Sequence, residues 1–117
     1  MSDEHVFKNI ELGRALSLQE LVSYQEGQVV SRTLAQRPET SVTLFAFDAG
    51  EGLSKHTAAG DALVQVLEGR AKITLDEDEH LVDAGQSLVM PAGVPHAVDA
   101  PDRFKMLLTV IKPATAG

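Results

Sequence analysis

Short apolar segments separated by turn residues run along most of this chain of 117 residues. The clearest lies at 41–47, SVTLFAF, where Val42, Leu44 and Ala46 alternate with two phenylalanines. Alternation with a period of two predicts a β-strand. Because both faces of the strand are apolar, we expect it to be covered on both sides.

The same kind of pattern predicts strands at 28–36, 62–69, 71–75, 80–82 and 104–111, and on both sides of the Pro-Ala-Gly turn at 91–93. At most one short helix is expected, at 16–24, with Ser17 as its cap and Glu20 completing a capping box. Seven or eight short strands with frequent turns predict an all-β sandwich or barrel. A chain of this length forms one domain.

Composition and charge narrow the functional classes. The chain has no cysteine, which excludes disulfides and thiolate metal sites. A net charge of −7 without a basic stripe makes nucleic acid and anionic membrane surfaces poor partners. No apolar run approaches the ~20 residues of a membrane span, and the N-terminus lacks a signal pattern. We therefore expect a cytoplasmic protein.

Two stretches carry a more specific pattern. The first runs from Gly50 to Gly69 and places His56 after five intervening residues. The second, GQSLVMPAGVPH at 85–96, follows the spacing G-x5-P-x-G-x2-H. Glycines suit tight turns with positive φ, and the two prolines stiffen the loop before His96. Together the two stretches resemble the paired signature motifs of the cupin family.

The resemblance covers residues 25–112 and implies a single-domain cupin jelly-roll β-barrel. Residues 1–24 are then an N-terminal segment with the short helix and a possible dimer arm, and 113–117 a frayed tail. Small cupins form homodimers in which N-terminal strands join the partner's sheet, so we expect a homodimer here. His56 and His96 would meet across a pocket between the sheets.

Metal-binding cupins carry two histidines and a glutamate in the first motif and a third histidine in the second. Here His56 and His96 occupy two of these positions, whereas Ala58 and Ala62 occupy the other two. Catalytic divalent metals normally have at least three protein ligands. The resemblance therefore implies at most a weakly bound divalent metal at His56 and His96, and no certain cofactor.

The pocket is instead expected to bind a small-molecule ligand through His56, Gln65 and His96. Its apolar wall is expected to comprise Leu44, Val64, Met106 and Leu108. Gln65 has a second interpretation, as a hydrogen-bond partner of a neighbouring strand or subunit.

Two other functions stay open. One is a cupin enzyme of the dioxygenase or isomerase type, with a two-histidine metal site or a histidine acting as general base. The other is a dimeric scaffold without catalysis. The scaffold supports many unrelated chemistries, so the ligand itself is not predicted.

Overall fold

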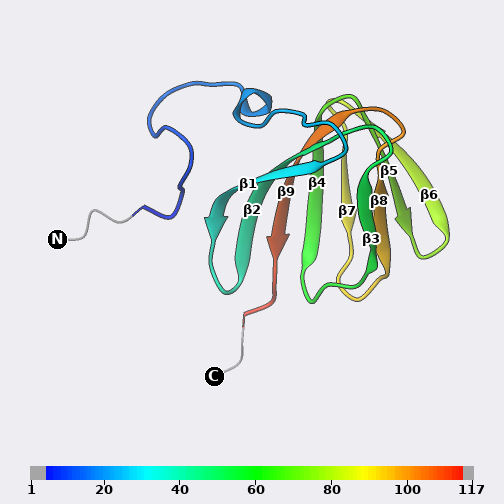
Figure 1. Cartoon of the computed structure of the whole chain (residues 1–117). Coiled ribbons are helices and arrows are strands. Elements are labelled where there is room, and N and C mark those ends of the chain that lie inside the picture. Colours follow the sequence, from blue (N-terminus) through cyan, green and yellow to red (C-terminus); the bar gives the residue numbers. More distant parts are fainter. Residues whose placement is uncertain (1–4, 115–117) are drawn as a thin grey trace.

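The computed structural model describes residues 5–114. Two antiparallel β-sheets face each other, and the N-terminal segment extends along one side (Figure 1). The strands are β1 (Val29–Gln36), β2 (Thr40–Phe47), β3 (Gly52–His56), β4 (Asp61–Glu68), β5 (Arg70–Leu75), β6 (Asp78–Asp83), β7 (Ser87–Met90), β8 (His96–Asp99) and β9 (Phe104–Ile111). The first sheet has the order β1-β2-β9-β4-β7 and the second the order β3-β8-β5-β6. The chain is thus an all-β single domain, as the alternating segments predict.

The described residues contain nine strands, one more than the highest number that the sequence pattern predicts. The additional strand is β3, which contains GLSKH and has no apolar alternation. It pairs with β8 at the edge of the four-stranded sheet, so its backbone hydrogen bonds, rather than its side chains, place it there.

The predicted short helix is smaller than expected. It is a single turn of 3-10 helix, η1 (Leu18–Leu21). Ser17 precedes it, but its side chain makes no capping hydrogen bond, so the predicted capping box is wrong. The turn is closed by the backbone instead, since the amide of Glu20 donates to the carbonyl of Ser17 at 3.1 Å.

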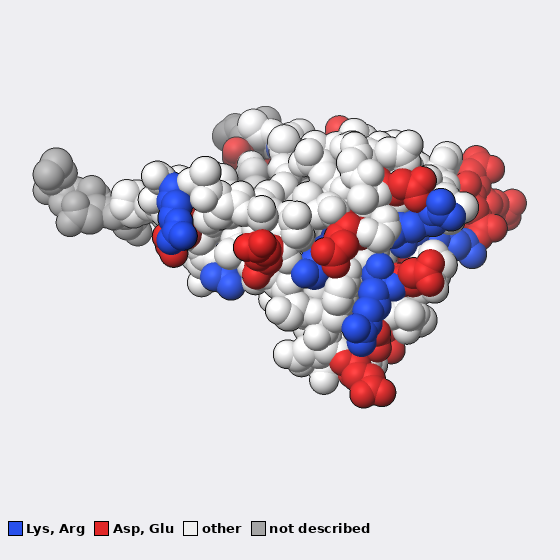
Figure 2. Space-filling model, turned by 90° about the horizontal axis from the view of Figure 1, so that it is seen from above, with Lys and Arg blue, Asp and Glu red and all other residues white. Residues whose placement is uncertain are grey.

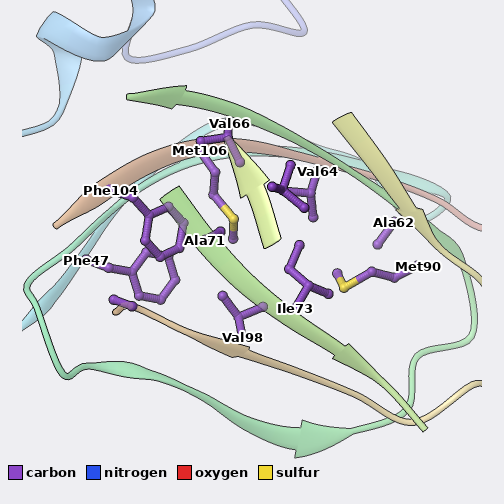
Figure 3. Close-up of a cluster of buried hydrophobic side chains, with 12 residues drawn as sticks. Phe47, Ala62, Val64, Val66, Ala71, Ile73, Met90, Val98, Phe104 and Met106 are labelled. Carbon is purple, nitrogen blue, oxygen red and sulfur yellow. The ribbon is translucent and has the colours of Figure 1, made fainter. Parts of the chain in front are cut away.

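The main core fills the space between the sheets (Figure 3). Val64 and Val66 project into it from β4 and Ile73 from β5. At one end, the rings of Phe47 and Phe104 stack with centroids 4.5 Å apart and planes within 7°. The chain has few aromatic residues, and this stacked pair supplies the bulk that closes that end of the sandwich.

A second core covers the outer face of the five-stranded sheet. Leu44 and Ala46 lie there, fully buried, while Phe47 on the same strand faces the main core. Val22 and residues of η1 pack over them from the N-terminal segment. The prediction that 41–47 is covered on both sides is confirmed.

Hydrogen bonds hold the N-terminal segment along β1, the edge strand of its sheet. The amide of Lys8 donates to the carbonyl of Leu34 at 2.8 Å, and the side chain of Asn9 donates to the carbonyl of Thr33 at 2.7 Å. Arg32 returns a bond to the carbonyl of Asn9 at 2.7 Å. These contacts occupy part of a strand edge that would otherwise be free to pair.

Tyr24 provides a second attachment. Its hydroxyl donates to the carboxylate of Glu68 at 2.5 Å, and the cationic groups of Arg103 and Lys105 lie 5.2 and 4.9 Å from its ring centroid. Burial and the hydrogen bond to Glu68 raise the pKa of the Tyr24 hydroxyl, so it remains a neutral donor.

Charges of both signs are interspersed over the face shown in Figure 2, and no continuous basic stripe crosses that face. Within residues 5–114 the structure contains no helix long and apolar enough to cross a membrane.

Candidate functional site: a histidine pair over an apolar cavity

The two motif histidines meet at one point of the four-stranded sheet. His56 ends β3 and His96 begins β8, and the two residues are cross-strand partners. Their rings lie edge to face, with centroids 4.4 Å apart and planes at 68°. The expected convergence of His56 and His96 is therefore present in the fold.

A bulge in β3 turns His56 toward the interior. Leu53 pairs with Val98 and His56 pairs with His96, so β3 has one more residue than β8 between the two pairs. In a regular strand, residues three apart point to opposite faces. The extra residue lets both Leu53 and His56 line the same cavity.

The loop before His96 is tied to the segment after His56. The amide of Gly93 donates to the carbonyl of Ala58 at 2.9 Å, and the amide of Ala92 donates to the carboxylate of Asp61 at 2.8 Å. Gly93 has a φ of 78°, as predicted for a glycine turn. The two motifs are thus connected by hydrogen bonds as well as by strand pairing.

Both rings have the same hydrogen-bonding pattern. Nδ1 of His56 lies 2.9 Å from the carbonyl oxygen of Ser54, and Nδ1 of His96 lies 3.2 Å from that of Val94. A carbonyl oxygen only accepts, so in each neutral ring Nδ1 carries the proton. Each Nε2 then keeps a free lone pair and can accept a hydrogen bond or bind a metal ion.

The two histidines differ in exposure. His96 is 3% exposed and is the buried polar residue among residues 5–114, whereas His56 is exposed at the mouth of the cavity. Burial lowers the pKa of His96, the carbonyl of Val94 opposes this shift, and the neighbouring charge of protonated His56 lowers the pKa further. His96 therefore favours the neutral form.

Below the rings lies a partly enclosed cavity of about 70 Å³. Its lining includes His56, His96, Met90, Met106 and Leu108. Larger surface hollows lie at the turn between β5 and β6, about 480 Å³, and between the N-terminal segment and β1, about 440 Å³. Both are more open to solvent than the small cavity, so the small cavity removes a ligand from water more completely.

The structure places the other expected pocket residues on two different faces. Met106 and Leu108 line the cavity, and Val64 is fully buried in the core that surrounds it. Leu44 and Gln65 lie on the opposite face of the sheet. Both are cross-strand partners of Leu107, which packs in the outer core with Leu44.

Several cavity residues are absent from the expected set, notably Met90, Leu53 and Val98. Met90 could have been predicted from its place in the sequence, because it directly precedes Pro91 of the second motif. It also ends β7, where it shares the inward face with Leu88. Leu53 depends on the β3 bulge and has no comparable signal.

The ligand set of metal-binding cupins does not fit these residues. Ala58 and Ala62 stand at the second histidine and glutamate positions, and both line the cavity with side chains that cannot bind a metal. Across residues 5–114, no group of three or more His, Cys, Asp or Glu side chains is placed to hold a metal ion. The four-ligand divalent site of the family is therefore incomplete.

Comparison with known proteins agrees with this fold and site. The cupin domain family matches residues 43–112, which include both motifs and the strands between them. The chain belongs to the cupin family.

The chain is similar to proteins that themselves have no assigned role. A conserved protein of unknown function from Streptococcus pyogenes is 41% identical, with a TM-score of 0.94, over 97% of this chain and 100% of that chain. A cupin superfamily protein from Desulfitobacterium hafniense is 36% identical, with a TM-score of 0.87, over 92% and 98%. An uncharacterised protein of Streptomyces coelicolor is 36% identical over 62% of this chain and 70% of that protein.

Proposed function

We propose that this protein binds a small, uncharged molecule in the cavity beneath His56 and His96. The observation that carries the proposal is the pair of free Nε2 lone pairs at one end of a cavity that is otherwise lined by hydrocarbon and thioether groups. Such a cavity favours a ligand with an apolar body and one hydrogen-bond donor.

The charge of the ligand follows from the lining. Because both Nδ1 protons are used by backbone carbonyls, the neutral rings offer acceptors and no donors to the cavity. An anion would find no hydrogen-bond donor there, and the low pKa of His96 opposes protonation of that ring. Burial of an unpaired charge is costly, so a neutral donor such as an alcohol is preferred.

The size of the ligand follows from the volume. An apolar cavity of about 150 Å³ holds benzene, so about 70 Å³ suits a group of about three to four non-hydrogen atoms. A larger molecule would project past His56 into solvent. The lining favours binding over catalysis. Among its described residues, the titratable side chains are the two histidines, and no carboxylate pairs with either of them to assist proton transfer.

The test uses two probes of equal size on the full chain. Isotope-labelled protein is titrated with 2-propanol and, separately, with acetate, while backbone amide NMR signals are recorded. We expect 2-propanol to shift the signals of the residues around His96 and acetate to leave them in place. The affinity will be weak, since the upper limit is about 1.5 kcal/mol per non-hydrogen atom.

The control is His96→Ala, whose fold is checked by its circular dichroism spectrum. This variant should lose the 2-propanol shifts. The proposal is overturned if acetate binds in preference to 2-propanol, or if the shifts are the same in His96→Ala.

We also propose that two copies of the chain associate through the N-terminal segment. Four apolar side chains of this segment are exposed: Val6 at 52%, Phe7 at 48%, Leu12 at 53% and Leu16 at 37%. The segment lies at the edge of the five-stranded sheet, beside β1 (Figure 1), so its exposed apolar side chains are accessible to a second copy. An identical chain would bury the same surface on both sides of a two-fold interface.

The oligomeric state is measured by light scattering after size exclusion. Phe7→Asp should shift the chain from dimer to monomer, whereas Leu81→Asp, at a site on β6 that is 58% exposed, should not. A monomeric wild-type chain, or equal effects of both variants, would contradict this assembly.

A further inference from the structure

Two methionine side chains line the same small cavity as the two imidazoles, and this combination has a chemistry that the family's usual ligand set lacks. We propose that the cavity is a site for a soft monovalent cation, Cu(I), bound by Nε2 of His56, Nε2 of His96 and the sulfur of Met90. This inference goes beyond the binding of a neutral molecule and uses the same pocket.

The lining disfavours the divalent ions of the family. The positions of its second histidine and its glutamate are Ala58 and Ala62, so no carboxylate compensates a double charge. The cost of transferring an ion out of water rises with the square of its charge, so a divalent ion is penalised about fourfold more than a monovalent one. A neutral ligand set therefore favours a single positive charge.

The lining also favours a soft ion. Thioether sulfur selects Cu(I), whereas oxygen ligands suit the harder divalent ions. Imidazole nitrogen is compatible with copper as well. Two imidazoles and one thioether thus form a neutral set of three donors that matches Cu(I) better than zinc, iron or manganese.

Met90 is the methionine that lies beside Ala62, the position at which metal-binding cupins carry a glutamate. It is the cross-strand partner of Ala62 in the β4–β7 pair, and its side chain is 3% exposed. Figure 3 shows Met90 next to Ala62, whereas Met106 lies farther from Ala62, toward Phe104. Side chains of directly paired residues are neighbours, so the Met90 side chain lies beside the position of the missing carboxylate.

The histidines are oriented as ligands of a metal ion usually are. Each Nδ1 proton is held by a backbone carbonyl, Ser54 for His56 and Val94 for His96. Such second contacts set the tautomer and leave Nε2 free for the metal. The rings lie 4.4 Å apart between centroids, and both residues line the same small cavity.

The experiment measures Cu(I) affinity of the full-length chain without oxygen, by competition with the colorimetric chelator bathocuproine disulfonate. We expect one Cu(I) per chain. Met90→Leu, which keeps the volume and removes the sulfur, should weaken binding by about tenfold or more, as the loss of even an outer-shell contact can. Met106→Leu makes the same change at the second thioether of the lining, and a larger loss of affinity there than in Met90→Leu would overturn the assignment of Met90 as the ligand.

Zn(II) is titrated in parallel against a zinc indicator, and circular dichroism checks each variant's fold. The inference is overturned if Cu(I) does not bind, if Zn(II) binds as tightly as Cu(I), or if Met90→Leu has no effect. Titration of the wild-type chain with 2-propanol tests small-molecule binding separately from the copper site. Failure of the copper site therefore leaves the proposal of small-molecule binding intact, and the loss of 2-propanol shifts in wild type would remove that proposal alone.

Discussion

His56 lies directly opposite His96 in the β3–β8 pair, although a regular ladder counted from Leu53 and Val98 would place Lys55 there. One extra residue in β3 therefore decides whether an imidazole or an ammonium group faces the cavity. Lys55 instead points outward, where its ammonium group donates to the carbonyl of Asp76 at 2.6 Å. The chemistry of the pocket depends on this single irregularity.

The titration of His96 is the first testable consequence of its burial. Because burial lowers its pKa, the folded chain binds this proton at lower pH than the unfolded chain, whose histidines titrate near pH 6.5. The unfolded state then binds more protons below that pH, so stability rises with pH. We expect the contribution of His96 to be complete above about pH 6.5 and to be lost as pH falls through its folded pKa.

The measurement is NMR titration of the ring signals combined with urea unfolding at several pH values. His96→Gln removes the titrating group and should flatten the dependence between neutral and mildly acidic pH. A His96 ring that titrates above 6.5 in the folded protein would contradict the assignment of a buried, neutral imidazole.

Gly69 provides a test of close backbone packing between the β4–β5 turn and the segment that precedes β9. It has a φ of +75°, and a Cβ atom there would lie 2.2 Å from the carbonyl oxygen of Arg103. Gly85 has a similar φ of +89° but has open space where its Cβ would lie. An alanine held at positive φ costs about 1–3 kcal/mol in backbone strain. The loss of stability in Gly85→Ala therefore measures this strain alone, whereas the loss in Gly69→Ala also includes the clash of the new Cβ with the Arg103 carbonyl.

We expect Gly69→Ala to lower the free energy of unfolding by at least about 1 kcal/mol more than Gly85→Ala, because the backbone before Phe104 must move. Urea unfolding of the two variants measures this difference directly. Equal losses would show that the β4–β5 turn relaxes without cost.

Leu44 tests whether the N-terminal segment forms a real second core. It is fully buried on the outer face of the sheet, beneath Val22 and η1. Leu44→Ala should lower the free energy of unfolding by about 2–5 kcal/mol, because it removes buried methyl groups and leaves a cavity. Leu81→Ala, at a side chain that is 58% exposed, should change it by less than about 0.5 kcal/mol.

Thermal and urea unfolding of both leucine variants provide the comparison. If Leu44→Ala costs no more than Leu81→Ala, the N-terminal segment does not shield the sheet in solution.

Much of the fold follows from local patterns in the chain. Alternation in 41–47 and 104–111 predicts strands, since successive side chains point to opposite faces. The glycine and proline spacing of 85–96 predicts a tight turn and a presented histidine, and Gly85 and Gly93 do have positive φ. These features are local because they depend on backbone conformations that a few adjacent residues determine.

The sequence is a poorer guide to which face of each strand points toward the core. Both sides of 41–47 are apolar, so periodicity does not say whether Leu44 or Phe45 faces inward. The structure places Leu44 outward because the N-terminal segment covers it. Gln65 follows the same rule: it neighbours Val64 in β4, and adjacent residues of a regular strand cannot both face one cavity.

Local patterns in the chain predict the all-β class, the strand segments with clear alternation and the two motif turns, and they show two histidines where a metal site of the family has four ligands. The folded chain sets which faces point inward, which methionine lies beside Ala62, and that His56 rather than Lys55 meets His96. The reason is physical: alternation and turn geometry act over a few residues, whereas a bulge and its cross-strand register depend on a partner strand about forty residues away.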